Sequence, residues 1–356
     1  MTSYRDRQTG ALVYQVTSDP SINHPVYFLE SSFTPDGRRI LFTSYRTGEP
    51  QLFSAGFPDG ETEQLTFGAP IHPYSAAIRG EQAFFVRGGE IRRLRLDTRT
   101  EEPIAAFEGQ LGEVSPDATG DWLVAAIKSP AGCGLVCGRS NGTEWKFIPF
   151  PRTVIHPQFH PLEPEWIEFA GDPAPRMHRV RRDGSGLECL YQHGNEEFVV
   201  HETFLGNTGD LVFTVWPRRL CRMDWTTREI RVITEGNAWH ITPNRAGTQV
   251  LCDTNHPDTG IWLIDAASGD WRPVCLSESG NQGTQWRRST YALPSDFLAA
   301  RTSNLNNLSW METPTDTVYG PQWTHPHPAF SADERRITFT SDRSGYPQVY
   351  VADLLC

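Results

Sequence analysis

A short unit recurs along the chain and limits the folds that the chain can adopt. In its two clearest copies, Ser32–Gly48 and Ala329–Gly345, a strand ends in a turn and a second strand with alternating apolar residues follows. Weaker copies place turns near Gly80, Asp117, Glu163, Thr208 and Arg245. Successive turns lie 37 to 46 residues apart, except for a last gap of 88, and four-stranded propeller blades have about this period. The repeat predicts an all-β chain, a seven-bladed β-propeller that forms one domain over residues 1–356.

The two ends of the chain predict how this ring closes. Gln348–Leu354 would be only the third strand of the last blade, and residues 11–17 could supply the fourth. Residues 277–316 are rich in Ser, Asn, Thr and Arg and have little period-two patterning. We therefore expect a long loop insertion there rather than an eighth blade.

Composition and charge argue against several classes of function. The net charge is −11, and no block of Lys or Arg indicates a nucleic-acid partner. No apolar run is long enough to span a bilayer, and the first residues lack the apolar core of a secretion signal, so we expect no membrane association and a cytoplasmic location. Seven cysteines without paired spacing predict reduced thiols.

The segment Gly320–Pro328 concentrates candidate metal ligands. In an extended chain the side-chain period is two, so His325 and His327 should point to the same side, and the prolines beside them stiffen that conformation. Gln322 could supply an oxygen. The same run could instead be an exposed loop, because two histidines and one amide match no complete metal signature.

Four segments carry a resemblance to a known family: Gln322–Pro328, Ala238–Ile241, Val200–Phe204 and Pro175–Met177. Together, on a repeat that resembles TolB-like propellers, they resemble the oligogalacturonate lyases, which cleave short pectic oligouronides by β-elimination. The resemblance implies a divalent metal of the Mn²⁺ type and an acidic oligosaccharide as substrate. It also implies the roles of six residues: a metal site of His240, Gln322, His325 and His327, a proton-abstracting His201 and a catalytic Arg176.

These residue types suit the chemistry of β-elimination. Removing the C5 proton of a uronate is difficult, because the neighbouring carboxylate must take on more negative charge. A divalent cation and a guanidinium stabilise that charge, and imidazole, with an unperturbed pKa of roughly 6.5, is a suitable base near neutral pH.

Several of these side chains also have purely structural interpretations. His240 could be a structural histidine at the start of a strand, His201 could pack beside Phe204, and Arg176 could belong to a solvated basic strand. Further candidates for contact with metal or substrate are His24, Tyr27, Arg46, His156, His256 and Arg343.

The chain departs from the family pattern at Phe169–Pro175 and at Ile22–Tyr27. These departures favour a different chain length or a different uronide, such as an ulvan or glucuronan fragment. The alternative from another class is a non-catalytic TolB-like propeller that binds a protein or ligand in its central channel.

Overall fold

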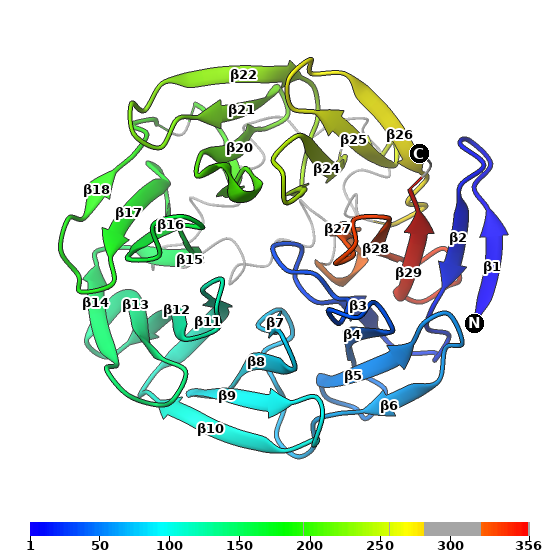
Figure 1. The fold of residues 1–356 in the computed structure, drawn as a ribbon, viewed down its shortest axis with the longest axis horizontal. Coiled ribbons are helices and arrows are strands. Elements are labelled where there is room, and N and C mark those ends of the chain that lie inside the picture. Colours follow the sequence, from blue (N-terminus) through cyan, green and yellow to red (C-terminus); the bar gives the residue numbers. More distant parts are fainter. Residues whose placement is uncertain (195, 256, 281–321, 355–356) are drawn as a thin grey trace.

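The computed structural model describes residues 1–194, 196–255, 257–280 and 322–354. Within these ranges the chain forms seven antiparallel sheets, arranged as a ring around a central axis (Figure 1). The helical elements in the same ranges are two 3-10 turns, η1 (Gly206–Thr208) and η3 (Gln322–Thr324). The predicted all-β, seven-bladed propeller is confirmed.

In each of the first six blades the strands follow one another along the chain, and the first of them lies nearest the axis (Figure 1). The seventh blade combines strands from both ends of the chain. The first three blades comprise β3 (Asn23–Pro25), β4 (Arg39–Ser44), β5 (Gln51–Gly56) and β6 (Thr62–Gln64); β7 (Ala77–Arg79), β8 (Gln82–Arg87), β9 (Glu90–Arg95) and β10 (Glu101–Ala106); and β11 (Gln110–Pro116), β12 (Trp122–Ser129), β13 (Gly132–Arg139) and β14 (Lys146–Phe150). The next three comprise β15 (Thr153–Phe159), β16 (Trp166–Asp172), β17 (Met177–Arg181) and β18 (Glu188–Cys189); β19 (Val199–Phe204), β20 (Leu211–Val215), β21 (Arg219–Met223) and β22 (Ile230–Glu235); and β23 (Ile241–Pro243), β24 (Gln249–Asp253), β25 (Ile261–Asp265) and β26 (Trp271–Cys275). The seventh comprises β27 (Ala329–Phe330), β28 (Arg336–Ser341), β29 (Gln348–Asp353), β2 (Leu12–Gln15) and β1 (Thr2–Arg5).

All seven turns predicted from the repeat connect the first and second strands of a blade. In the first copy, the Thr34 hydroxyl donates to the Asp36 carboxylate at 2.7 Å and accepts the amide of Arg39 at 3.0 Å. In the last copy, Ser331 donates to Asp333 at 2.7 Å and accepts the amide of Arg336 at 3.0 Å. The repeated Thr/Ser and Asp therefore cap the same turn in both blades.

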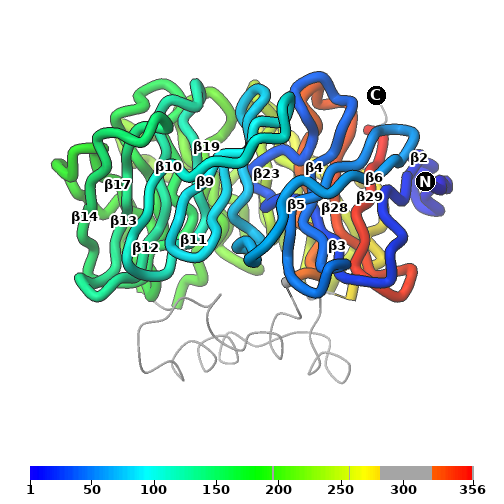
Figure 2. The backbone as a smooth tube through the Cα atoms, turned by 90° about the horizontal axis from the view of Figure 1, so that it is seen from below, coloured from blue at the N-terminus to red at the C-terminus, as the bar shows by residue number. Residues whose placement is uncertain are grey.

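The chain ends close the ring as predicted, with one addition. β2 pairs antiparallel with β29, so that Val13 faces Ala352 and Gln15 faces Tyr350. β1 then adds a fifth strand outside β2, which the sequence did not indicate. Figures 1 and 2 show both strands beside β29 at the rim of the ring.

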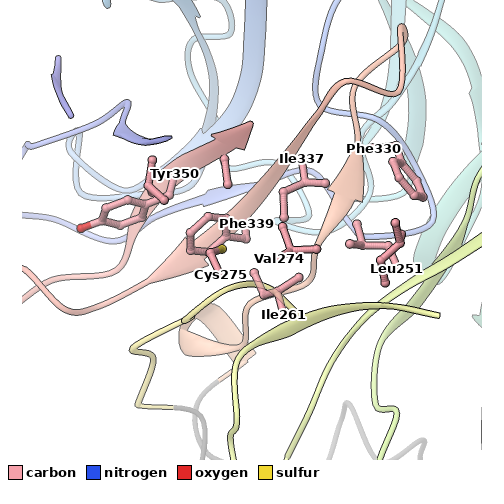
Figure 3. Close-up of a cluster of buried hydrophobic side chains, with 11 residues drawn as sticks. Leu251, Ile261, Val274, Cys275, Phe330, Ile337, Phe339 and Tyr350 are labelled. Carbon is pink, nitrogen blue, oxygen red and sulfur yellow. The ribbon is translucent and has the colours of Figure 1, made fainter. Parts of the chain in front are cut away.

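Neighbouring blades pack face to face through apolar side chains. Between the sixth and seventh blades, Leu251 and Val274 meet Ile337 and Phe339 in one buried cluster (Figure 3). Val13 of the closing strand is fully buried in the same cluster. The closing strand therefore contributes core packing as well as hydrogen bonds to the last blade.

The predicted insertion at 277–316 falls mostly outside the described residues, and it stays a prediction, as does the single-domain assignment. The six cysteines within the described ranges carry free thiols, in agreement with the sequence. None of the helices in these ranges has the length and apolar character needed to cross a membrane.

Substituting Val13→Ala should lower the free energy of unfolding by about 1–3 kcal/mol, because the methyl groups leave a cavity at the closure. Chemical denaturation measures this loss. Ser3→Ala on the exposed side of β1 is the matched control and should leave stability unchanged. Equal stabilities for the two variants would show that the closing strand contributes little packing.

Candidate metal centre

Three histidines from two blades meet near the axis of the ring. His240 directly precedes β23, and His325 and His327 lie between η3 and β27. One ring nitrogen from each lies within 4.8 Å of the others, and all three side chains are buried. The ring centroids of His240 and His327 are 4.0 Å apart. These three residues could hold a metal ion.

The backbone around His325 and His327 does not have the extended conformation that the sequence predicted. His327 has a φ of 45°, in the left-handed region that non-glycine residues seldom adopt. Both rings nevertheless reach the cluster, with centroids 5.6 Å apart. The prediction of a shared side holds, but simple strand alternation was the wrong reason for it.

Asp253 fixes the orientation of His240. Its carboxylate accepts hydrogen bonds from the backbone amide and from Nδ1 of His240, each at 2.7 Å. Nδ1 therefore carries the proton and Nε2 carries the lone pair. The buried Nε2 atoms of His240 and His327 have no hydrogen-bond partner among the described residues. A carboxylate that accepts the other ring N–H and an unpartnered ring nitrogen opposite it are typical of histidines that bind a metal ion.

Burial keeps these imidazoles neutral. It lowers the pKa of His240 and of His327 well below 6.5, and repulsion from neighbouring histidines lowers both further. Burial also raises the pKa of the Asp253 carboxyl to about 7, while hydrogen bonds from the His240 and His327 amides oppose that shift. Neutral imidazole is the protonation state that binds metal.

Two sequence candidates cannot be placed at this centre. Gln322 begins η3, but its side chain lies outside the described part of the structure. His256, the alternative ligand, also lies outside it.

His201 lies directly beside the triad. Its ring centroid is 4.5 Å from that of His240, and it packs edge-on against Trp239 at 4.5 Å. Burial lowers its pKa well below 6.5, and His240 and His156 lower it further. Its buried Nδ1 has no hydrogen-bond partner among the described residues. His201 is therefore a neutral imidazole that could accept a proton.

Arg176 is a buried cation rather than part of a solvated strand. Its side chain is 1% exposed. Nε and Nη2 donate to the two carboxylate oxygens of Glu202 at 2.8 and 3.2 Å, and Nη1 donates to Asp172 at 3.3 Å. Arg176 holds the pKa of Glu202 at about 2 despite burial, and Glu202 in turn raises the pKa of Arg176. One N–H on each terminal nitrogen remains for another acceptor.

Tyr27 and His156 extend this buried network. The Tyr27 hydroxyl lies 2.9 Å from His156 Nε2, and His156 Nδ1 lies 4.0 Å from a Glu202 carboxylate oxygen. The Tyr27 ring is also 5.4 Å from that of His327. The network therefore links the arginine pair to the metal triad.

Three innermost strands are irregular at the positions that face this network. Register shifts interrupt β11 between Leu111 and Val114, β15 between Ile155 and Gln158, and β19 between Val200 and Thr203. His156 and His201 lie within two of these bulges, with φ of 54° and 56°. Bulges change the direction of side chains and are common beside functional sites.

The remaining candidates separate into two groups. His24 belongs to the central region, because its ring stacks on Tyr74 at 4.6 Å. Arg46 packs over Phe53, with its guanidinium carbon 4.7 Å from the ring centroid. Arg343 packs over Tyr4 at 3.9 Å and pairs with Glu278 at 3.0 Å. The two arginines pack on the blades rather than at the central region.

Sequence reasoning assigned no role to Asp253, Glu202 or Asp172. Asp253 could have been found from strand register, because Ile241 pairs with Cys252 and the next pair outward is His240 with Asp253. Glu202 follows His201 directly, but a bulge places both side chains near the axis, and no sequence pattern indicates that bulge.

The comparisons with known proteins agree with this geometry. No protein-family model matches the chain. A protein named "Oligogalacturonate lyase" from Dickeya dadantii (strain 3937) is 24% identical, over 98% of this chain and 95% of the relative. An "Oligogalacturonide lyase" from Pectobacterium atrosepticum is 22% identical over the same shares. The solved structure "Oligogalacturonate lyase in complex with manganese" superposes with a TM-score of 0.82 and 21% identity, over 99% of this chain and 96% of that one.

The resemblance to the oligogalacturonate lyases is thereby confirmed. It extends along nearly the whole chain in both sequence and fold. By contrast, the match to "Tol-Pal system protein TolB" from Bordetella pertussis is 41% identical but covers only 15% of this chain. The TolB likeness is therefore local, and the likeness to the lyase family includes the segments that carry the buried histidines.

Replacing Glu202 by Gln should destabilise the fold by about 3–5 kcal/mol, because it removes the main counter-charge of a buried arginine. Chemical denaturation near neutral pH measures this loss. Glu229→Gln, which affects the exposed pair with Arg231, is the control and should have no measurable effect.

The difference between wild type and Glu202→Gln should also depend on pH. The pKa of Glu202 is depressed from 4.5 to about 2, so its stabilisation is fully present above pH 4.5 and is lost as pH falls towards 2. The stability gap should narrow over that window. A gap that stays constant would mean that the carboxylate charge is not what stabilises the fold.

Proposed function

We propose that this protein is a metal-dependent lyase that cleaves short oligogalacturonates by β-elimination and releases 4,5-unsaturated products. The observation that supports this most directly is the buried triad of His240, His325 and His327 with the neutral His201 ring against it. The full-length resemblance to oligogalacturonate lyases agrees with this reaction.

In this proposal His240, His325 and His327, with Gln322 as a fourth ligand, would hold a divalent cation, most suitably Mn²⁺. Bound there, it would lower the energy of the negative charge that develops on a uronate carboxylate. Asp253 hydrogen-bonds Nδ1 of His240 and so leaves Nε2 free to bind such an ion.

His201 is the base. Its neutral imidazole takes the C5 proton, the C5–H electrons form the C4–C5 double bond, and the C4–O4 bond breaks with its electrons on O4. A water molecule then protonates the leaving oxygen. The surrounding Trp239 and His240 rings fix the orientation of His201, and its position in the β19 bulge directs the side chain inward.

Arg176 supplies fixed positive charge. Its pairing with Glu202 and Asp172 uses three of its five N–H groups. The remaining two can donate to the substrate carboxylate, whose charge increases as the proton leaves. Because the ion pairs hold the guanidinium in place before substrate arrives, little reorganisation is needed.

The decisive experiment follows the ultraviolet absorbance of the unsaturated uronide during incubation of Mn²⁺-loaded protein with di- and trigalacturonate. We expect a rise in absorbance that a chelator abolishes. A flat trace with one equivalent of metal bound would favour another uronide. A flat trace without bound metal would favour the non-catalytic binding propeller.

His201→Ala should eliminate turnover while it leaves the metal stoichiometry unchanged, because His201 is beside the triad rather than part of it. Absorbance and elemental analysis measure the two properties. His160→Ala is a matched control, since this histidine packs against Trp225 at 4.6 Å, outside the central network. Normal turnover in His201→Ala would show that His201 is not the base.

Asp253→Asn should weaken metal binding by about 10–100-fold, because the amide orients His240 less strongly than the carboxylate does. Competition with a chromogenic chelator measures the affinity. An unchanged metal affinity would show that Asp253 has only a structural role.

A further inference from the structure

A cavity of about 210 Å³ lies between the second, third and fourth blades and is not used by the proposed catalytic residues. It is lined by the loop before β7, by β11, by the β12–β13 hairpin and by the start of β15. A cavity of roughly 150 Å³ holds a benzene ring, so this one has room for a single sugar ring.

One wall of the cavity, Tyr74, packs near the histidine triad. Tyr74 lines it, and the Tyr74 ring lies 6.0 Å from His327 and 5.7 Å from Tyr27. Ile155, which also lines it, directly precedes His156. A sugar ring in the cavity would therefore lie next to a residue bound at the triad.

The cavity contains a cation with no partner. Lys128 at the end of β12 lines it, and the chain has only one other lysine, Lys146. No ion pair or side-chain hydrogen bond joins the Lys128 amine to another described residue, whereas the buried Arg176 nearer the axis is paired with two carboxylates. In a protein of net charge −11, an unpaired amine in a cavity wall is a local site for an anion.

The polar groups differ between the two ends of the cavity. Gln110 lies opposite Lys128 in the β11–β12 register, and Glu113 is buried further along β11. The Tyr74 hydroxyl is buried without a hydrogen-bond partner among the described residues. The cavity therefore has an amine at one end and acceptor groups at the other. This matches a ligand that carries a carboxylate at one edge and hydroxyls at the other.

We propose that this cavity binds a second uronate unit of the oligosaccharide, with the carboxylate of that unit on Lys128. The substrate class rests on the proposed function. Lys128 is a binding residue in this arrangement, and it determines affinity for chains longer than the unit that is cleaved.

The test is calorimetric titration of trigalacturonate into Mn²⁺-loaded His201→Ala protein, which should keep the ligand intact. Adding Lys128→Met, which preserves the length of the side chain, should weaken binding about tenfold or more, because it removes a charge-assisted hydrogen bond. Adding Lys128→Arg should largely restore binding. Lys146→Met, at an exposed position of β14, is the matched control and should bind as the parent does.

A second measurement uses the Mn²⁺-loaded His201→Ala protein with both lysines unchanged. Trigalacturonate should protect Lys128 from an amine-reactive reagent and leave Lys146 reactive, as read by peptide mass spectrometry. This readout does not depend on whether a lysine variant folds.

The outcomes separate this inference from the proposed function. Unchanged affinity in Lys128→Met, equal labelling of both lysines, or no binding by the parent would each overturn the inference, even in an active lyase. Lysine-dependent binding in a protein that never produces an absorbance change would uphold the cavity site and reject the proposed cleavage of oligogalacturonates.

Discussion

The pairing of β2 with β29 is the constraint on which the rest of the structure depends. It joins the first residues of the chain to the last blade and removes an open edge, so that seven sheets form a closed ring. Closure directs the innermost strands of all blades to one axis. Residues as far apart as Tyr27 and His156, 129 positions along the chain, become hydrogen-bonded neighbours there.

Burial at this axis has opposite consequences for two kinds of side chain. The imidazoles of His201, His240 and His327 lose their charge, because desolvation lowers their pKa and their neighbours repel a proton. Arg176 keeps its charge, because Glu202 and Asp172 compensate it within hydrogen-bond distance. The centre therefore contains neutral lone pairs suited to a cation next to a fixed positive charge suited to an anion.

Three of the eight described non-glycine residues with positive φ lie where chemistry is proposed. His156, His201 and His327 all have φ between 45° and 56°, a conformation that costs free energy for residues with a side chain. Two of them lie within bulges of innermost strands, where regular pairing would have placed their side chains differently. The surrounding blades hold these conformations, and as a result the imidazoles converge near the axis.

The sequence by itself determined the blade repeat and its turns, because these depend on interactions within a few residues. The Thr34–Asp36 turn and the period-two alternation are such interactions. The sequence also indicated the candidate histidines and the closing strand, which completes a last blade that is one strand short. Strand register within one blade places Asp253 opposite His240. Only the tertiary structure decided that Glu202 neutralises Arg176 and that Lys128 lines a cavity between three blades. Those arrangements bring different blades together, and residue types alone do not indicate which strands a closed ring will make neighbours.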